Sequence, residues 1–149
     1  MESLEYIIMK LTEHFTLEEL TYTSKKFDNT PNNATLARLS KLCELLEVVR
    51  KEYGHPIKIT SGYRSPKVNA AVGGVKTSQH LYGEAADMKA IGTTNKELFD
   101  VIVKLIKDRK IQCGQCIWEY GTKKEPGWIH LSLMRSNKPN NQILYLGVK

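Results

Sequence analysis

The sequence predicts an α+β protein, and the order of its hydrophobic patterns is the main reason. Helical patterns come first, two short strand patterns follow, then one more helix, and three strand patterns end the chain. Because the strands are grouped and do not alternate with helices, we expect a mainly antiparallel sheet with flanking helices. The length of 149 residues suits one domain, so we expect residues 1–149 to form a single domain.

Capping signals and apolar spacing predict the first helices. Thr16 followed by Glu19 is a capping box that begins a short helix. After an irregular segment with Asn-Thr-Pro as its breaker, a long helix is expected from about residue 34 to residue 53. Its apolar residues recur at helical spacing and are expected to pack in the core: Leu36, Leu39, Leu42, Leu46 and Val49.

The rest of the chain predicts most of the sheet. Strands are expected at "PIKIT" and "EAADMKA", with a short helix at "SPKVNAAVGG" between them. A helix at 93–110 follows, with Thr94 and Glu97 as its capping box. The last strands are "QCIWEYG", "GWIHLSLM" and "NQILYLG", and the polar loop between the first two predicts a hairpin.

Composition limits the partners. The net charge of +6 is dispersed, and no basic stripe with interleaved aromatics is present, so we expect no nucleic acid partner. No apolar run is long enough to span a membrane, and the first residues, "MESLEYIIMKLTEH", lack the pattern of a signal peptide. We therefore expect a chain made in the cytoplasm that does not enter a membrane and acts as a monomer.

The three cysteines are expected to be ordinary reduced thiols. Cys113 and Cys116 form a CxxC pair, but no second pair of Cys or His lies at a spacing that would complete a structural zinc site. The pair precedes a predicted strand and not a helix, which argues against a thioredoxin-like motif.

Two of the four histidines stand out. His14 and His55 have no obvious partner in the sequence and are interpreted as structural. His80 precedes a stretch of small residues that leads to Asp87, and His130 lies within a predicted strand. Two histidines and a carboxylate from separate segments can bind a catalytic zinc with one open position. Hydrogen bonding between histidine and aspartate in a core is the alternative that the residues alone leave open.

The stretch "SQHLYGEAADM", followed downstream by "WIHLS", resembles the zinc peptidases of the D-Ala-D-Ala carboxypeptidase family. Their pattern is Ser-x-His-x-x-Gly-x-Ala-x-Asp with a later His. The group includes vancomycin-resistance dipeptidases and phage L-alanyl-D-glutamate endolysins, and hedgehog signalling domains share the fold. "HFTLEEL", the "NTP" turn and "ITSGYRSPKVNAAVGG" are similar to small phage and prophage members, so the resemblance extends over about residues 11–133.

The resemblance implies zinc held by His80, Asp87 and His130, and a glutamate as general base. In the dipeptidase and endolysin branches that glutamate lies three residues before the last histidine, where this chain has Gly127. Glu119, at the end of the "QCIWE" strand, is therefore the expected base, provided that the hairpin register puts it on the face of His130. Glu125 in the loop is the second choice. A solvated acid at a strand end is the alternative interpretation of Glu119.

The resemblance also assigns roles around the metal. Arg64, in "SGYR", is expected to bind a substrate carboxylate or the oxyanion, with a structural ion pair as the alternative. Substrate contact or support of the ligands is expected of the flanking residues Ser61, Tyr63, Ser78 and Gln79. The residues leave open whether Trp118 and Trp128 lie in the core or line a cleft.

The expected function is zinc-dependent hydrolysis of peptide bonds in peptidoglycan stem peptides, as a carboxypeptidase or an endopeptidase. Such a protein would reach the cell wall after release or as part of a phage assembly. The alternative is a catalytically inactive, zinc-stabilised module that binds cell wall or a protein partner. Gly127 is the reason to keep that alternative.

Overall fold

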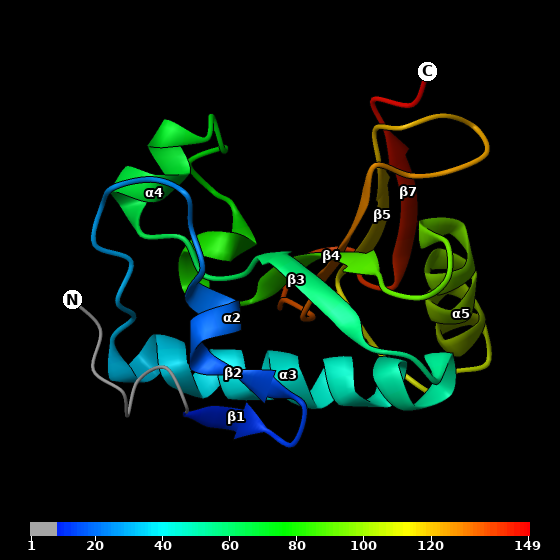
Figure 1. Cartoon of the computed structure of the whole chain (residues 1–149), viewed down its shortest axis with the longest axis horizontal. Coiled ribbons are helices and arrows are strands. Elements are labelled where there is room, and N and C mark those ends of the chain that lie inside the picture. Colours follow the sequence, from blue (N-terminus) through cyan, green and yellow to red (C-terminus); the bar gives the residue numbers. More distant parts are fainter. Residues whose placement is uncertain (1–8) are drawn as a thin grey trace. The chain divides into compact units, whose positions relative to one another are not determined.

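The computed structural model describes residues 9–149 (Figure 1). The first eight residues, which contributed to the expectation of no signal peptide, lie outside the described part. Within residues 9–149 no helix has both the length and the apolar character needed to cross a membrane.

The chain divides into two compact units. The first contains the described residues up to Glu47 together with Ile59–Ala86, and the second contains Val48–Lys58 and Asp87–Lys149. The division passes through one long helix and two strands, so these elements contribute residues to both units. That the whole chain behaves as one domain stays a prediction.

The first unit begins with a small β-hairpin and is mainly helical after it. Strands β1 (Lys10–Thr12) and β2 (Phe15–Thr16) pair antiparallel. Helix α2 (Leu17–Thr21) starts at the predicted capping box, in which Thr16 and Glu19 exchange hydrogen bonds. The other elements with residues here are α3 (Asn33–Tyr53), β3 (Ile57–Ser61), the short α4 (Pro66–Ala71), the 3-10 helix η1 (Gln79–Tyr82) and the start of β4 (Ala85–Ala90).

The second unit packs one helix against a sheet. Helix α5 (Asn95–Lys107) is capped by Thr94, whose hydroxyl accepts the N–H of Glu97 at 3.1 Å; this is the Thr94 half of the predicted capping box. Its Phe99 ring meets Trp118 edge-on, with the ring centroids 5.2 Å apart. Figure 1 shows α5 beside the strands β5 (Gln115–Glu119) and β7 (Gln142–Leu146). The remaining strand is β6 (Trp128–Ser132).

The five-stranded sheet has the order β3-β4-β6-β5-β7. Strands β5 and β6 form the predicted antiparallel hairpin, but β7 runs parallel to β5 on its other side. The parallel strand was not foreseen, because the pattern of a strand does not report its direction. The α+β fold class is confirmed.

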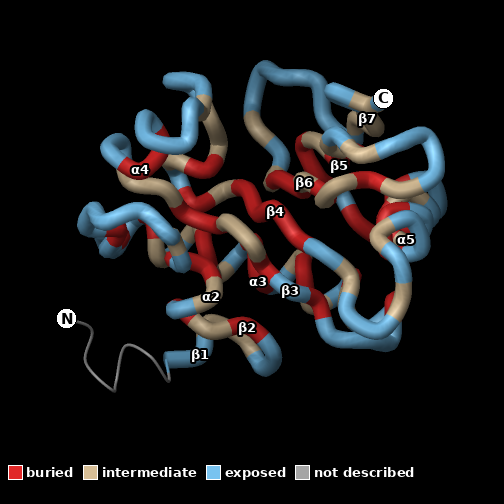
Figure 2. The backbone as a smooth tube through the Cα atoms, turned by 45° about the horizontal axis from the view of Figure 1, so that its top comes forward, coloured by how far each residue is buried: buried red, intermediate tan, exposed pale blue. Residues whose placement is uncertain are grey.

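The leucine stripe of α3 is buried as predicted, with one exception. Leu39, Leu42, Leu46 and Val49 have no exposed surface, whereas Leu36 is only half-buried. Leu36 lies in the first turn of the helix, where Thr35 faces inward instead, with 4% of its surface exposed. Figure 2 shows buried residues through most of β4.

Candidate metal centre and active site

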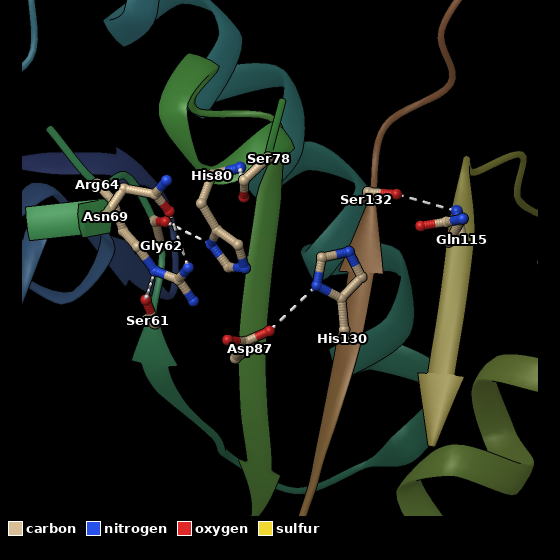
Figure 3. A network of polar contacts seen from close by, with 10 residues as sticks. All are labelled: Ser61, Gly62, Arg64, Asn69, Ser78, His80, Asp87, Gln115, His130 and Ser132. Atoms are coloured by element: carbon tan, nitrogen blue, oxygen red, sulfur yellow. Dashed lines mark hydrogen bonds and ion pairs between the residues drawn. The ribbon is translucent and has the colours of Figure 1, made fainter. Parts of the chain in front are cut away.

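Asp87 and His130 come from two strands of the second unit. Asp87 lies in β4 and His130 in β6, and the two strands are neighbours in the sheet. The Nδ1 atom of His130 is 3.1 Å from Oδ1 of Asp87, and the two side chains are 12% and 11% exposed (Figure 3). The pair is therefore a largely buried imidazole–carboxylate contact.

His80 lies in the 3-10 helix η1 of the first unit and is 3% exposed. Its Nδ1 is 2.7 Å from the carbonyl oxygen of Gly62 (Figure 3). A carbonyl only accepts, so in the neutral imidazole the proton is on Nδ1 and the lone pair is on Nε2. This is the arrangement that prepares a histidine to bind a metal through Nε2.

The backbone at Gly62 explains why a glycine precedes Tyr63. A Cβ atom added to Gly62 would lie 2.4 Å from the carbonyl oxygen of Leu20, at the end of α2. That same carbonyl accepts the N–H of Tyr63 at 2.7 Å. The close approach fixes the segment whose carbonyl orients His80.

His80, Asp87 and His130 together form a group that can hold a metal ion. Each offers one ligand atom, and these atoms all lie within 4.8 Å of one another. Ligands bonded at 2.0–2.1 Å to one tetrahedral zinc would be about 3.3 Å apart, close to the separation of the Asp87 and His130 atoms. Two imidazoles and a carboxylate are a donor set that suits zinc.

The hairpin register decides where Glu119 lies. Ile117 pairs with His130, and Glu119 pairs with Trp128. Side chains alternate along a strand, so Glu119 is on the same face as His130, in the diagonal position. This is the register that the assignment of Glu119 as a base required, and Glu119 is half-buried there.

Glu125 is engaged elsewhere. Its Oε1 accepts the backbone N–H of Lys96, in the first turn of α5, at 3.0 Å. Gly127, where related branches have a glutamate, donates its N–H to the carbonyl oxygen of Glu119 at 3.0 Å. Of the two candidate bases, only Glu119 is on the same strand face as His130.

Arg64 follows β3 in the first unit and is half-buried. Its Nε donates to Oγ of Ser61 at 3.0 Å, and its Nη1 donates to Oδ1 of Asn69 at 3.3 Å (Figure 3). Its backbone N–H donates to the carbonyl oxygen of His80 at 3.0 Å. Arg64 is thus bonded both to its neighbours in sequence and to the residue that supplies a candidate ligand.

The other predicted site residues have structural contacts in the first unit. Ser78 caps η1 by accepting the N–H of His80, and Gln79 is the first residue of that helix. Tyr63 is 9% exposed, and burial raises the pKa of its phenol, with Asp28 adding to the effect. The hydroxyl of Ser61 accepts from Arg64.

The comparisons with known proteins agree with this arrangement. The profile of the family described as Peptidase M15 matches residues 13–132. The chain belongs to the Peptidase M15 family. It is also 35% identical over 80 residues to the zinc D-Ala-D-Ala carboxypeptidase of Streptomyces albus G. That alignment spans 52% of this chain and 31% of the relative, so the chain matches less than a third of the relative's length.

The cysteines of this member of the Peptidase M15 family are free, as expected, and all three are buried. Burial raises the pKa of the Cys113 thiol to about 11. The pKa of the Cys116 thiol is raised further, by burial and then by electrostatic repulsion from Cys113. Neither belongs to the metal-binding group found among the described residues.

His14 has a partner that the sequence did not reveal. Its Nδ1 is 2.6 Å from Oε1 of Glu47, and the other oxygen of Glu47 accepts from the hydroxyl of Thr12 and the N–H of His14. The contact is between β-hairpin and α3, more than thirty residues apart in sequence, so no local pattern could predict it. His55 packs its ring against Tyr53, at 5.2 Å between centroids.

The two tryptophans have different environments in the structure. Trp118 is 4% exposed and belongs to the core, where its Nε1 donates to the carbonyl oxygen of Thr122 at 3.1 Å. Trp128 is half-buried, stacks on Tyr120 with centroids 5.2 Å apart, and lies on the face of His130. Two buried asparagines, Asn29 and Asn69, contact the Arg64 segment and were not among the predicted site residues. Their only signal in the sequence is their place, Asn29 as the first residue of the NTP turn and Asn69 within "SPKVN".

Proposed function

We propose that this protein is a zinc-dependent peptidase that hydrolyses peptide bonds in peptidoglycan stem peptides. The observation that supports this most directly is the group of His80, Asp87 and His130 in a chain of the Peptidase M15 family. The name of the Streptomyces relative, a zinc D-Ala-D-Ala carboxypeptidase, supports the substrate class. Cleavage at the carboxyl terminus of the stem and cleavage within it both fit this proposal.

In this proposal the zinc ligands are His80, Asp87 and His130. Zinc, when bound, polarises the scissile carbonyl and makes water a better nucleophile at neutral pH. The chain orients the donors beforehand, because Gly62 fixes the tautomer of His80 and the strand pairing brings Asp87 to His130. Less reorganisation is then needed when the ion binds.

Glu119 is the proposed general base. On the face of His130, it would take a proton from the attacking water and deliver it to the leaving amine. A half-buried carboxylate at a strand end can exchange protons with solvent and still reach the substrate. Glu125 is the second choice, because it lies in the loop between β5 and β6, whereas Glu119 lies on the strand face of His130.

Arg64 is the proposed anchor for a substrate carboxylate or the developing oxyanion. Stem peptides end in a carboxylate, and a guanidinium held in place can bind such a group with paired hydrogen bonds. Ser61 and Asn69 restrict two of its nitrogen atoms. We further propose that the protein acts as a monomer, after release to the cell wall or within a phage assembly.

Gly127 favours a second candidate function. The place where related branches have their glutamate has no side chain here, and a protein without a working base would keep zinc and fold but not cleave. Such a protein would be a binding module for cell wall or for a protein partner.

Digestion of purified peptidoglycan with the zinc-loaded protein tests both candidates. Release of D-alanine indicates a carboxypeptidase, and new stem-peptide amino groups with intact D-alanine indicate an endopeptidase. A His130→Ala variant is the matched negative control. Sedimentation with peptidoglycan in the absence of any product would support the binding module and overturn the peptidase.

A further inference from the structure

Asn69 is buried and uses both ends of its amide. It lies in α4, is 4% exposed, and accepts a hydrogen bond from Nη1 of Arg64 at 3.3 Å. Its Nδ2 donates to the carbonyl oxygen of Val75 at 2.9 Å. A buried amide is costly unless both ends are paired, and here each pairing has a different partner. The side chain therefore connects the guanidinium of Arg64 to the loop after α4.

The loop after α4 is shaped around this amide. A Cβ atom added to Gly74 would lie 2.1 Å from Oδ1 of Asn69 and 3.1 Å from Nη1 of Arg64. The backbone N–H of Gly74 donates to the carbonyl oxygen of Asn69 at 2.9 Å. Close packing against Asn69 and Arg64 thus explains the glycine at this position.

A second buried asparagine holds the backbone on both sides of Arg64. Asn29 is 8% exposed and follows α2 in the irregular segment. Its Nδ2 donates to the carbonyl oxygen of Tyr63 at 2.9 Å and also to that of Thr21 at 2.8 Å. Its Oδ1 accepts the N–H of Ser65 at 2.7 Å. One side chain therefore fixes the residue before Arg64 and the residue after it.

We propose that Asn29 and Asn69 are positioning residues that jointly fix Arg64, Asn29 through its backbone and Asn69 through its guanidinium. Asparagine suits this task because its amide oxygen orients the guanidinium without adding a negative charge of its own. An arginine with a restricted guanidinium loses less freedom when it binds a carboxylate. The inference rests on the proposed function in one respect, that Arg64 contacts the substrate.

Steady-state kinetics on a stem peptide test the coupling. We expect Asn69→Ala to lower kcat/KM by roughly tenfold or more, since small misplacement of a binding group has effects of this order. Gly74→Ala, which displaces Asn69 without altering its chemistry, should act in the same direction. Val68→Ala is the matched control, because Val68 is the buried neighbour of Asn69 in α4, and its truncation removes apolar packing but neither amide group of Asn69.

A double-mutant cycle separates positioning from general destabilisation. If Asn69 acts through Arg64, the double variant Arg64→Ala with Asn69→Ala should be no slower than Arg64→Ala alone. Losses that multiply, or a Val68→Ala variant as slow as Asn69→Ala, would overturn the proposal. If the wild-type protein cleaves the peptide and Arg64→Ala is fully active, Arg64 does not bind the substrate and the proposed role of Arg64 is wrong.

A spectroscopic measurement tests the same proposal without any activity. We expect the Nε–H proton of Arg64, assigned by its loss in Arg64→Lys, to exchange slowly in wild type and in Val68→Ala. It should exchange faster in Asn69→Ala, in Gly74→Ala and in Asn29→Ala if that variant folds. Unchanged exchange in both Asn69→Ala and Gly74→Ala would refute the positioning role, even if wild type proves inactive on peptidoglycan.

Discussion

The segment from Ser61 to His80 and the β5–β6 hairpin both supply residues of the proposed site, but they hold them by different means. In the first, single polar contacts fix the residues: the side chains of Asn29 and Asn69 hold Arg64, and the backbone carbonyl of Gly62 holds His80. In the second, antiparallel pairing alone puts His130 and Glu119 on one face.

The difference has a physical origin. A strand pair has a period of two, so its register determines every side-chain direction at once. A loop has no such rule, and each backbone polar group in it needs its own partner. We therefore expect the loop-held side chains to depend on many single contacts, and the strand-held ones to depend on few.

The largest effect is expected when a proposed metal ligand is removed from either of the two regions. His80→Ala removes the ligand of the loop-held segment, and His130→Ala removes that of the hairpin. Each variant should lose most bound zinc and nearly all activity, because two remaining ligands bind the ion far more weakly. Metal analysis of protein purified without chelator measures this. If His80→Ala keeps its full zinc content, His80 is not a ligand, and only Asp87 and His130 of the proposed ligands remain.

The next effect sharpens the role of the hairpin. Glu119→Gln should keep zinc and fold but lower kcat by roughly a hundredfold or more, as loss of a general base does. Glu125→Gln is the matched control and should do little to turnover, since that carboxylate is bonded to the start of α5. Kinetics on a stem peptide, with metal analysis in parallel, measures both variants. If Glu125→Gln loses turnover and Glu119→Gln does not, the base is Glu125.

A third test concerns a contact of the first unit away from the proposed site. Burial alone would raise the pKa of Glu47, but hydrogen bonds from Thr12 and His14 outweigh it and lower the pKa below its ordinary 4.5. A lowered folded-state pKa stabilises the protein above the unfolded value and ceases to do so as pH falls through the folded one.

Glu47→Gln should therefore lower the free energy of unfolding by about 1–2 kcal/mol at pH 7, because charge-assisted hydrogen bonds are lost. The difference from wild type should shrink below pH 4.5. Urea unfolding at several pH values measures it, with zinc content expected to stay unchanged. A difference that is constant between pH 7 and pH 3 would show that the charge of Glu47 contributes nothing.

The smallest effect is expected at the cysteines. Replacing Cys113 and Cys116 by alanine should leave zinc content and turnover nearly unchanged, because neither belongs to the ligand group. In wild type, the raised thiol pKa of about 11 for Cys113 predicts slow alkylation at pH 8 without denaturant. Metal analysis and mass spectrometry check both statements. Loss of zinc in the double variant would give the CxxC pair a role that the fold does not suggest.

The sequence by itself determined the longer helices, the strands of the five-stranded sheet and the candidates for the site. It did not predict the β1–β2 hairpin or the 3-10 helix η1. The capping box at Thr16, the N-cap at Thr94, the apolar stripe of α3 and the alternating strands are local patterns, and the structure follows them. The polar loop between two strand patterns also predicted the antiparallel hairpin. Its register, which puts Glu119 on the face of His130, came only from the structure.

Tertiary structure alone decided the contacts between distant segments. The parallel direction of β7, the bond of His14 to Glu47 and the half-buried position of Leu36 have no local signal. The same holds for Asn29, which reaches across 34 residues to Tyr63. A sequence pattern reports which face of an element is apolar, but a buried amide finds its partners only when the backbone of other segments has been brought to it.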